Sequence, residues 1–195
     1  MKIPFPEVFV DETKNGTKLK TSDYQTSGTY PIIDQGQDFI AGYTDSENGL
    51  YTDVPAIIFG DHTRVLKYVD FPFFLGADGA KILKARKAHS NYRYLYYALK
   101  SVRIPDTGYN RHFKWLKEAT VSILDSQKQE SIVFTLDSIS RIISHRKSQL
   151  AKLDELVKCR FVELFGDMRV NTRGWENKTL GEACDVRDGT HDSPK

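Results

Sequence analysis

The chain has 195 residues, of which 39% are hydrophobic and 12% aromatic, so one compact domain with a real core can form. It has no run of about 18 apolar residues and no basic-then-apolar leader, which argues against membrane insertion and secretion. The two cysteines, Cys159 and Cys184, have neither metal-ligand nor disulfide-framework spacing, so we expect a reducing, cytoplasmic setting.

The formal net charge of +2 hides an uneven distribution. Residues 1–60 carry 4 Lys against 9 acidic residues (4 − 9 = −5), whereas residues 61–117 carry 12 Lys and Arg against 4 Asp (12 − 4 = +8). Basic and aromatic residues are interleaved in the second segment, as they are in many nucleic-acid-binding surfaces. A solvated basic face is the alternative interpretation.

Residues 1–50 are expected to form irregular β structure, because turn dipeptides such as Asn15-Gly16 recur and residues 30–33 form a short extended run. Residues 54–59 are continuously apolar, which predicts a strand buried on both faces. The polar residues of 61–64 follow directly after Gly60. A rigid strand that ends in polar side chains is a common way to present a binding loop.

Further strands are predicted over residues 65–68, 71–75 and 80–83, with a turn at 76–79. Residues 91–101 are predicted to form a helix, which Pro105 follows. The segment from Gly108 to Trp115 is predicted to be a polar loop, and residues 121–124 a last short strand.

One long helix is predicted over residues 126–165, with no proline or glycine in it. Ser126 and Gln129 have the spacing of a capping box, and Gly166 suits its end. At 1.5 Å per residue such a helix spans roughly 60 Å. Its apolar residues recur in steps of four and three, which is typical of a narrow seam against a second helix. The predicted dimerisation residues on this apolar stripe are Leu136, Ile139, Ile143, Leu150, Leu153 and Val157.

These elements predict an α+β fold, with a mixed α/β domain followed by one long coiled-coil helix. We expect one domain over residues 1–125, a spacer and dimerisation helix over 126–166, and over 167–195 a linker followed by the start of a segment that the chain does not finish.

The chain lacks the sequence motifs of common catalytic sites, so we expect no enzymatic activity. The five histidines have no metal-site spacing, and neither a Gly-x-Ser-x-Gly elbow nor a phosphate loop occurs. Arginine and asparagine can each form paired hydrogen bonds to a base edge, and lysines can contact phosphates. The predicted DNA-binding residues are His62, Thr63, Arg64, Lys67, Lys84, Tyr109, Asn110, Arg111, His112 and Lys114.

The sequence resembles the specificity subunits of type I restriction-modification systems. The resemblance rests on residues 31–37, 58–64, 76–81 and 108–114, and on the motifs that enter and leave the long helix, 129–133 and 153–167. It implies a target recognition domain that recognises half of a split double-stranded DNA site and a helix that sets the spacing between the halves. It also implies methyltransferase and restriction subunits as partners, with S-adenosylmethionine bound by the methyltransferase subunit and no cofactor in this chain.

A full member of that family has two recognition domains and two long helices that pack antiparallel, whereas this chain has one of each. We expect either a natural half-subunit, which would form a homodimer through the helix, or part of a longer subunit. Residues 175–195 resemble the opening of a second recognition domain. The alternative from another class is a coiled-coil scaffold protein with an incidental basic face.

Overall fold

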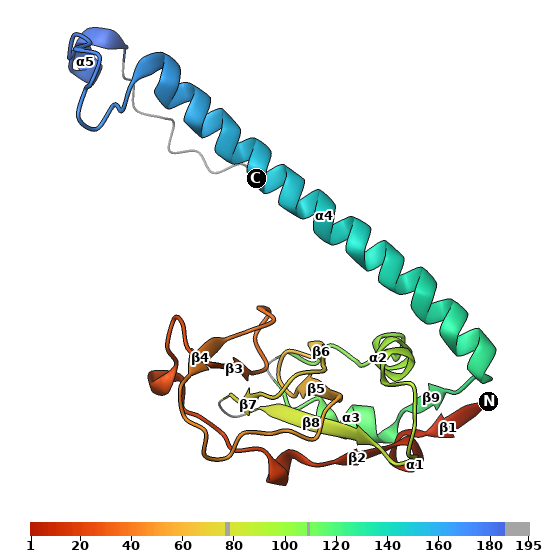
Figure 1. Cartoon of the computed structure of the whole chain (residues 1–195). Helices are drawn as coiled ribbons and strands as arrows, with labels where there is room; N and C mark the ends of the chain where they lie inside the picture. The colour runs from red at the N-terminus through yellow and green to blue at the C-terminus, as the bar shows by residue number, and fades with distance from the viewer. Residues whose placement is uncertain (77–78, 109, 186–195) are drawn as a thin grey trace. The chain divides into compact units, whose positions relative to one another are not determined.

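The structure, a computed structural model, describes residues 1–76, 79–108 and 110–185 of the chain. It divides into two compact units, Met1–Ser138 and Ile139–Lys195. The first unit is α+β and contains every strand of the described residues; the second contains most of the long helix and the segment after it (Figure 1).

The first unit consists of short strands with three helices between them. Its elements in chain order are β1 (Lys2–Pro4), α1 (Phe5–Val8), β2 (Phe9–Asp11), the 3₁₀ turns Thr13–Asn15 and Thr21–Asp23, β3 (Tyr30–Ile33), β4 (Gly42–Thr44), β5 (Ala56–Gly60), β6 (Leu66–Val69), β7 (Phe74–Leu75), β8 (Ala80–Ala85), α2 (Tyr92–Lys100), α3 (Phe113–Glu118), β9 (Thr120–Ser122) and the start of α4 (Ser126–Phe165).

A four-stranded antiparallel sheet in the order β2-β8-β5-β6 forms the middle layer of this unit. All residues of β5 are buried, which confirms the predicted two-sided strand. Because successive side chains point to opposite faces, Ile57 and Phe59 pack against α2 and α3. Ala56 and Ile58 pack instead against the small β4-β3-β7 sheet. The unit therefore has three layers: helices, the main sheet and the small sheet.

The helix predicted over residues 126–165 is confirmed as α4, but it is capped differently from the prediction. The Asp125 carboxylate accepts a hydrogen bond from the Lys128 N–H at 3.0 Å, and the Gln129 side chain donates to the Leu124 carbonyl at 2.8 Å. The cap is therefore Asp125, one residue earlier than predicted. Gly166, with φ of +82°, ends the helix as predicted.

The first compact unit extends beyond the expected boundary at residue 125 and includes α4 up to Ser138. Ile132 and Val133 pack against the core beside α2 and α3. One turn further on, the Arg93 guanidinium donates to the Asp137 carboxylate at 2.8 Å and lies 4.7 Å from the centre of the Tyr68 ring. The beginning of the helix is thus part of the domain's packing.

The second unit contains the rest of α4, a turn-rich segment and the short helix α5 (Leu180–Ala183). The Trp175 indole N–H donates to the Phe165 carbonyl at 2.7 Å, and the Arg173 side chain donates to the Glu163 carbonyl at 2.8 Å. These bonds satisfy carbonyls in the last turn of α4. None of the helices in the described residues is both long and apolar enough to cross a bilayer.

Candidate nucleic-acid interface

Four segments that are far apart in the sequence meet beside the end of β5. They are residues 34–37 after β3, residues 61–64 between β5 and β6, Gly79 before β8, and residues 106–112 before α3. The backbone N–H of Asp61 donates to the Gly79 carbonyl at 2.6 Å. The Asp61 carbonyl accepts from the His112 N–H at 2.7 Å. We call this group of segments the loop cluster.

Asp61 is the central residue of the loop cluster. Its buried carboxylate accepts a hydrogen bond from the backbone N–H of Phe113, the first residue of α3, at 2.7 Å. Its carbonyl also accepts from the His112 ring at Nδ1, 3.0 Å away. Because a carbonyl can only accept, Nδ1 carries the hydrogen. Asp61 thus joins the loop after β5 to the start of α3.

Gln35 joins the third segment to the same loop. Its side-chain oxygen accepts from the His62 N–H at 3.1 Å, and its carbonyl accepts from the Thr63 hydroxyl at 2.6 Å. Position 79 favours glycine because φ is +98°, a conformation that other residues rarely adopt; an added Cβ would also displace the Gln35 amide, whose nitrogen would lie 2.5 Å from it.

Arg64 lies in the left-handed region with φ of +61°, which is uncommon for a residue other than glycine. Its guanidinium donates to the Asp106 carboxylate at 2.7 Å, and about a third of the Arg64 side chain is exposed. The hydrogen bond from Arg64 holds the pKa of the Asp106 carboxyl below its usual value. The ion pair therefore connects the loop after β5 with the segment before α3.

Four of the predicted DNA-binding residues are exposed at the loop cluster and beside it: Thr63, Asn110, Arg111 and Lys114. Asn110 donates to the Thr107 carbonyl at 3.4 Å, and the Lys114 ammonium lies 4.8 Å from the centre of the Trp115 ring. Within the described residues Arg111 forms no ion pair or hydrogen bond. Tyr109 lies outside the described residues.

Two predicted DNA-binding residues of this region are buried, and we revise their assignment. The Lys67 side chain is 3% exposed; its ammonium donates to the Asp38 carbonyl at 2.5 Å and lies 3.5 Å from the Asp34 carboxylate. Burial lowers the pKa of Lys67. His112 is also buried, and its ring bonds to Asp61. Both residues hold the segments together, and neither presents its side chain at the surface.

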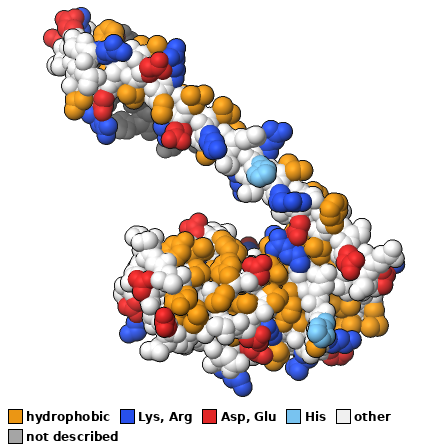
Figure 2. Space-filling view, viewed as in Figure 1, with side chains coloured by type: hydrophobic (Ala, Val, Ile, Leu, Met, Phe, Trp, Pro, Cys, Tyr) orange, Lys and Arg blue, Asp and Glu red, His pale blue; other side chains and the backbone are white. Residues whose placement is uncertain are grey.

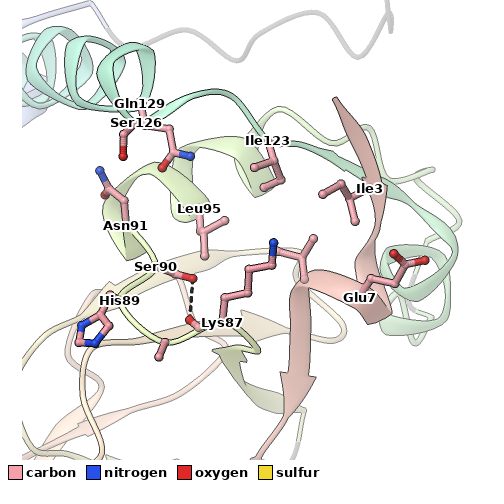
Figure 3. A pocket seen from close by; sticks show the side chains of 12 residues that line it. Ile3, Glu7, Lys87, His89, Ser90, Asn91, Leu95, Ile123, Ser126 and Gln129 are labelled. Atoms are coloured by element: carbon pink, nitrogen blue, oxygen red, sulfur yellow. Dashed lines mark hydrogen bonds between the residues drawn. The ribbon is translucent and has the colours of Figure 1, made fainter.

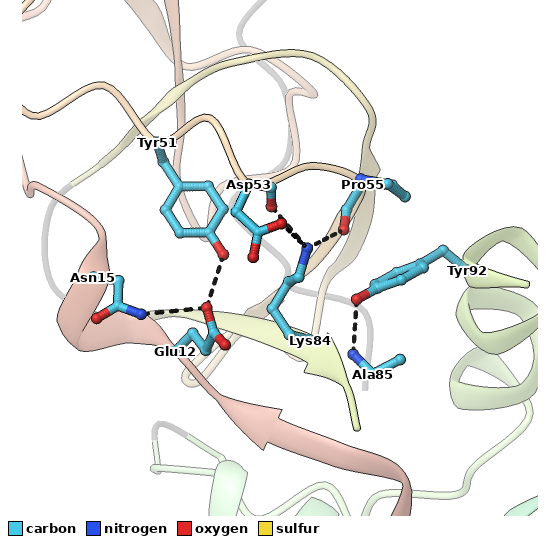
Figure 4. Close-up of polar contacts among 8 residues, drawn as sticks. All are labelled: Glu12, Asn15, Tyr51, Asp53, Pro55, Lys84, Ala85 and Tyr92. Carbon is cyan, nitrogen blue, oxygen red and sulfur yellow. Dashed lines mark hydrogen bonds and ion pairs between the residues drawn. The ribbon is translucent and has the colours of Figure 1, made fainter. Parts of the chain in front are cut away.

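Lys84 is not part of the loop cluster, so the predicted phosphate contact by this residue is also revised. Its buried ammonium donates to the Asp53 carbonyl and carboxylate, both at 2.8 Å, and to the Pro55 carbonyl at 3.0 Å. The Tyr92 ring lies beside it, with its centre 5.1 Å away. Figure 4 shows the Asp53 and Pro55 groups converging on the Lys84 ammonium. These bonds hold the segment that leads into β5.

A cavity of about 260 Å³ lies beyond the other end of β8, among α1, the loop before α2 and the start of α4 (Figure 3). Ile3, Val8, Leu95 and Ile123 give it an apolar floor. The six residues of β8 separate it from the loop cluster by about 20 Å. Two of the polar groups that line it are bonded to each other, since the Ser90 hydroxyl donates to the Lys87 carbonyl at 2.7 Å.

His62, Thr63 and Arg64 lie on one predicted loop and Asn110 to Lys114 on another, and the structure brings the two segments together. The sequence did not predict α3, which begins within the predicted polar loop and extends beyond it, and it did not indicate Gln35, Asp61 and Asp106 as organising residues. The spacing of the buried Phe113 and Leu116, one helical turn apart, was a signal for α3. The side-chain carboxylate of Asp61 bonds to a residue 52 positions away, so no local pattern contains both groups.

On α4 the predicted stripe is exposed from Ile139 onward. Ile143, Leu150 and Val157 are 51%, 62% and 69% exposed. Leu136 differs because it lies in the part of the helix that belongs to the first unit, and it is only partly exposed.

Residues 7–154 match the family model of the type I restriction modification DNA specificity domain. The chain belongs to this family. Over 103 residues, 51% of this chain, it is 31% identical to the specificity subunit of the type I restriction enzyme EcoR124I/EcoR124II of Escherichia coli, of which it covers 26%.

Two solved structures share the fold. The S subunit of a type I restriction-modification system from M. genitalium matches 90% of this chain and 48% of its own length, with a TM-score of 0.64 and 19% identity. A structure concerned with complex assembly and conformational transition of the type I system matches 81% of this chain and 42% of its own, with a TM-score of 0.53 and 17% identity. The chain therefore spans about half or less of the length of these relatives.

Proposed function

We propose that this chain is the DNA-recognition part of a type I restriction-modification specificity subunit and recognises one half of a bipartite double-stranded DNA site. The loop cluster is the observation that supports this proposal. Four of the segments that carry the family resemblance form this one surface, and Arg64, Asn110, Arg111 and Lys114 present polar side chains there. Buried hydrogen bonds hold the loops that carry these exposed side chains. Loops that are already ordered lose less conformational entropy when they bind DNA.

The exposed side chains have distinct roles in this proposal. Arg111 pairs with the O6 and N7 atoms of a guanine, and Asn110 pairs with an adenine in the major groove. Arg64 and His62 contact the same half-site from the neighbouring loop, while Lys114 contacts a phosphate and supplies affinity without sequence discrimination. Thr63 keeps the loop in place through its bond to Gln35.

The long helix supplies the spacing and the assembly. We propose that two copies pair antiparallel along the exposed part of the apolar stripe, which places a recognition domain at each end of an isologous dimer. Methyltransferase and restriction subunits bind to this scaffold in the cytoplasm. Catalysis and S-adenosylmethionine binding belong to those partners, and this chain contributes specificity alone.

Titration of the purified chain against fluorescent duplex DNA at increasing salt tests the proposal. We expect affinity to fall steeply with salt, since phosphate contacts release counterions, and Lys114→Ala to reduce the slope by about one. The Arg64→Ala, Arg111→Ala double variant is expected to lose both affinity and sequence discrimination.

The matched control is the Lys2→Ala, Lys87→Ala double variant, which removes the same charge at exposed positions outside the loop cluster. Equal losses of affinity in both double variants would mean that DNA binding depends only on the net charge of the chain. Absence of DNA binding by the intact chain would favour the scaffold alternative.

A further inference from the structure

A shallow apolar groove of about 450 Å³ lies on the small sheet, on residues that the proposed DNA interface does not use. It is lined by Thr29, Tyr30, Pro31, Ile40, Tyr43, Phe71 and Pro72. Phe39 extends it: this side chain is 46% exposed, and its ring meets the Phe71 ring edge-on with centres 6.0 Å apart. We call this surface the aromatic groove.

Hydrophobic side chains gather over this part of the first unit, with acidic side chains among and around them, as Figure 2 shows. Single exposed apolar residues are normal on a protein surface, but a contiguous group of this kind usually marks an interaction site. Aromatic residues in a groove are also the residue types that dominate binding energy in protein interfaces. The groove therefore has the composition of a docking site.

The charge around the groove selects the kind of partner. Residues 21–60 contain six acidic residues and no Lys or Arg. Asp45 lies at the groove because its carboxylate accepts hydrogen bonds from Thr29, a lining residue, at 2.9 and 2.8 Å. Asp38 and Asp70 are exposed and adjoin Phe39 and Phe71 in the chain.

The lysine of β6 does not offset these acids. Lys67 of β6 is buried, and its ammonium is already held by the Asp38 carbonyl and the Asp34 carboxylate. An acidic rim repels a phosphate backbone, so the groove is a poor second surface for DNA. It suits a protein segment in which positive charges flank an apolar side chain.

We propose that the aromatic groove binds a partner-protein segment that inserts an aromatic or large aliphatic side chain between Tyr43 and Phe71 and pairs flanking Lys or Arg residues with Asp38, Asp45 and Asp70. This interaction is separate from DNA recognition by the loop cluster. It gives the domain a second binding face of opposite electrostatic character.

Selection of a phage-displayed library of random 16-residue peptides against the full chain tests the inference. Enriched peptides are expected to carry an aromatic or large aliphatic residue beside Lys or Arg. Affinity of a selected synthetic peptide, measured by fluorescence anisotropy, should fall about tenfold or more in Phe39→Asp. It should fall several-fold in Asp70→Lys, with a weaker dependence on salt.

The matched controls are Phe134→Asp, at an exposed phenylalanine on α4, and Glu7→Lys, at an exposed acid outside the rim. Both should bind the peptide as the unmodified chain does, and DNA binding of all four variants is measured in parallel. Enriched peptides without basic residues, no enrichment, or equal binding by Phe39→Asp would overturn the inference. Enriched peptides that match a segment of this chain would overturn it too, because the occupant would then be a second copy.

Discussion

At the scale of single residues, the loop cluster contains two kinds of side chain. Some are buried and hold its segments together, and others are exposed on its surface. Asp61 and His112 are buried and bonded to each other's segments, whereas Arg111 and Lys114 are exposed. Residue type alone does not distinguish these roles, because a histidine or lysine is a plausible DNA contact until its burial is known.

Arg111→Ala is predicted to reduce affinity for the preferred duplex by about 1–3 kcal/mol and to relax discrimination at one base pair, if the guanidinium pairs with a guanine. Competition titrations with duplexes substituted one position at a time measure both effects. A uniform loss across all the duplexes would instead assign Arg111 to a phosphate.

Asp61→Ala is predicted to lower the free energy of unfolding by about 1–3 kcal/mol, because the buried N–H of Phe113 would lose its acceptor. Urea denaturation followed by circular dichroism measures the change. Lys114→Ala, at an exposed position nearby, should stay within about 0.5 kcal/mol of the unmodified chain. Similar stabilities for the two variants would show that the Asp61 bond contributes little.

At the scale of elements, strongly patterned segments were predictable and those set by distant contacts were not. The apolar run at β5 and the periodicity of α4 are local signals, and both elements were confirmed. The short helix α3 depends on Asp61, and the capping residue of α4 was misplaced by one position. The convergence of the four segments could not be predicted from the sequence for the same reason, since the hydrogen bonds that hold them join residues up to 52 positions apart.

Lys84 illustrates the limit within one element. The strand was predicted to end at residue 83, whereas β8 continues through Lys84. The Lys84 ammonium turns inward to a carboxylate and two carbonyls contributed by residues 53 and 55. A buried lysine and an exposed lysine in a strand have the same local sequence pattern. Whether the side chain is buried depends on the distant segment that packs against the strand.

Lys84→Met is predicted to lower the free energy of unfolding by about 1–3 kcal/mol, because three partly buried hydrogen bonds are lost and the two backbone carbonyls among their acceptors lose this partner. Once folded, the variant should bind DNA as tightly as the unmodified chain. Lys87→Met, at an exposed position just after the strand, serves as the control in both assays. Unchanged stability with weakened DNA binding would restore the original phosphate assignment.

At the scale of the whole molecule, the first unit and the long helix differ in how they bury their apolar side chains. The first unit buries its two clusters internally, whereas α4 from Ile139 onward leaves its apolar stripe exposed within the described chain. Burying each such side chain contributes roughly 1.5–3 kcal/mol, so a paired helix is much more stable than a single one in water.

The chain is therefore predicted to sediment as a dimer at micromolar concentration. Ile143→Asp or Leu150→Asp should shift it to a monomer, because a carboxylate would be buried without a partner in the seam. Ser144→Asp, on an exposed neighbouring position, should leave the dimer intact. A monomer in every case would remove the self-pairing proposal and leave a second helix of a longer subunit as the partner.

The most direct measurement of the central claim is selection of duplexes from a randomised DNA library by the purified chain, followed by sequencing of the bound fraction. Specific recognition by a symmetric pair of loop clusters predicts two inverted copies of one short half-site, separated by a fixed gap. It also predicts that the Arg64→Ala, Arg111→Ala double variant fails to enrich that sequence. A bound fraction with no sequence preference, or the same enrichment by the double variant, would contradict the claim.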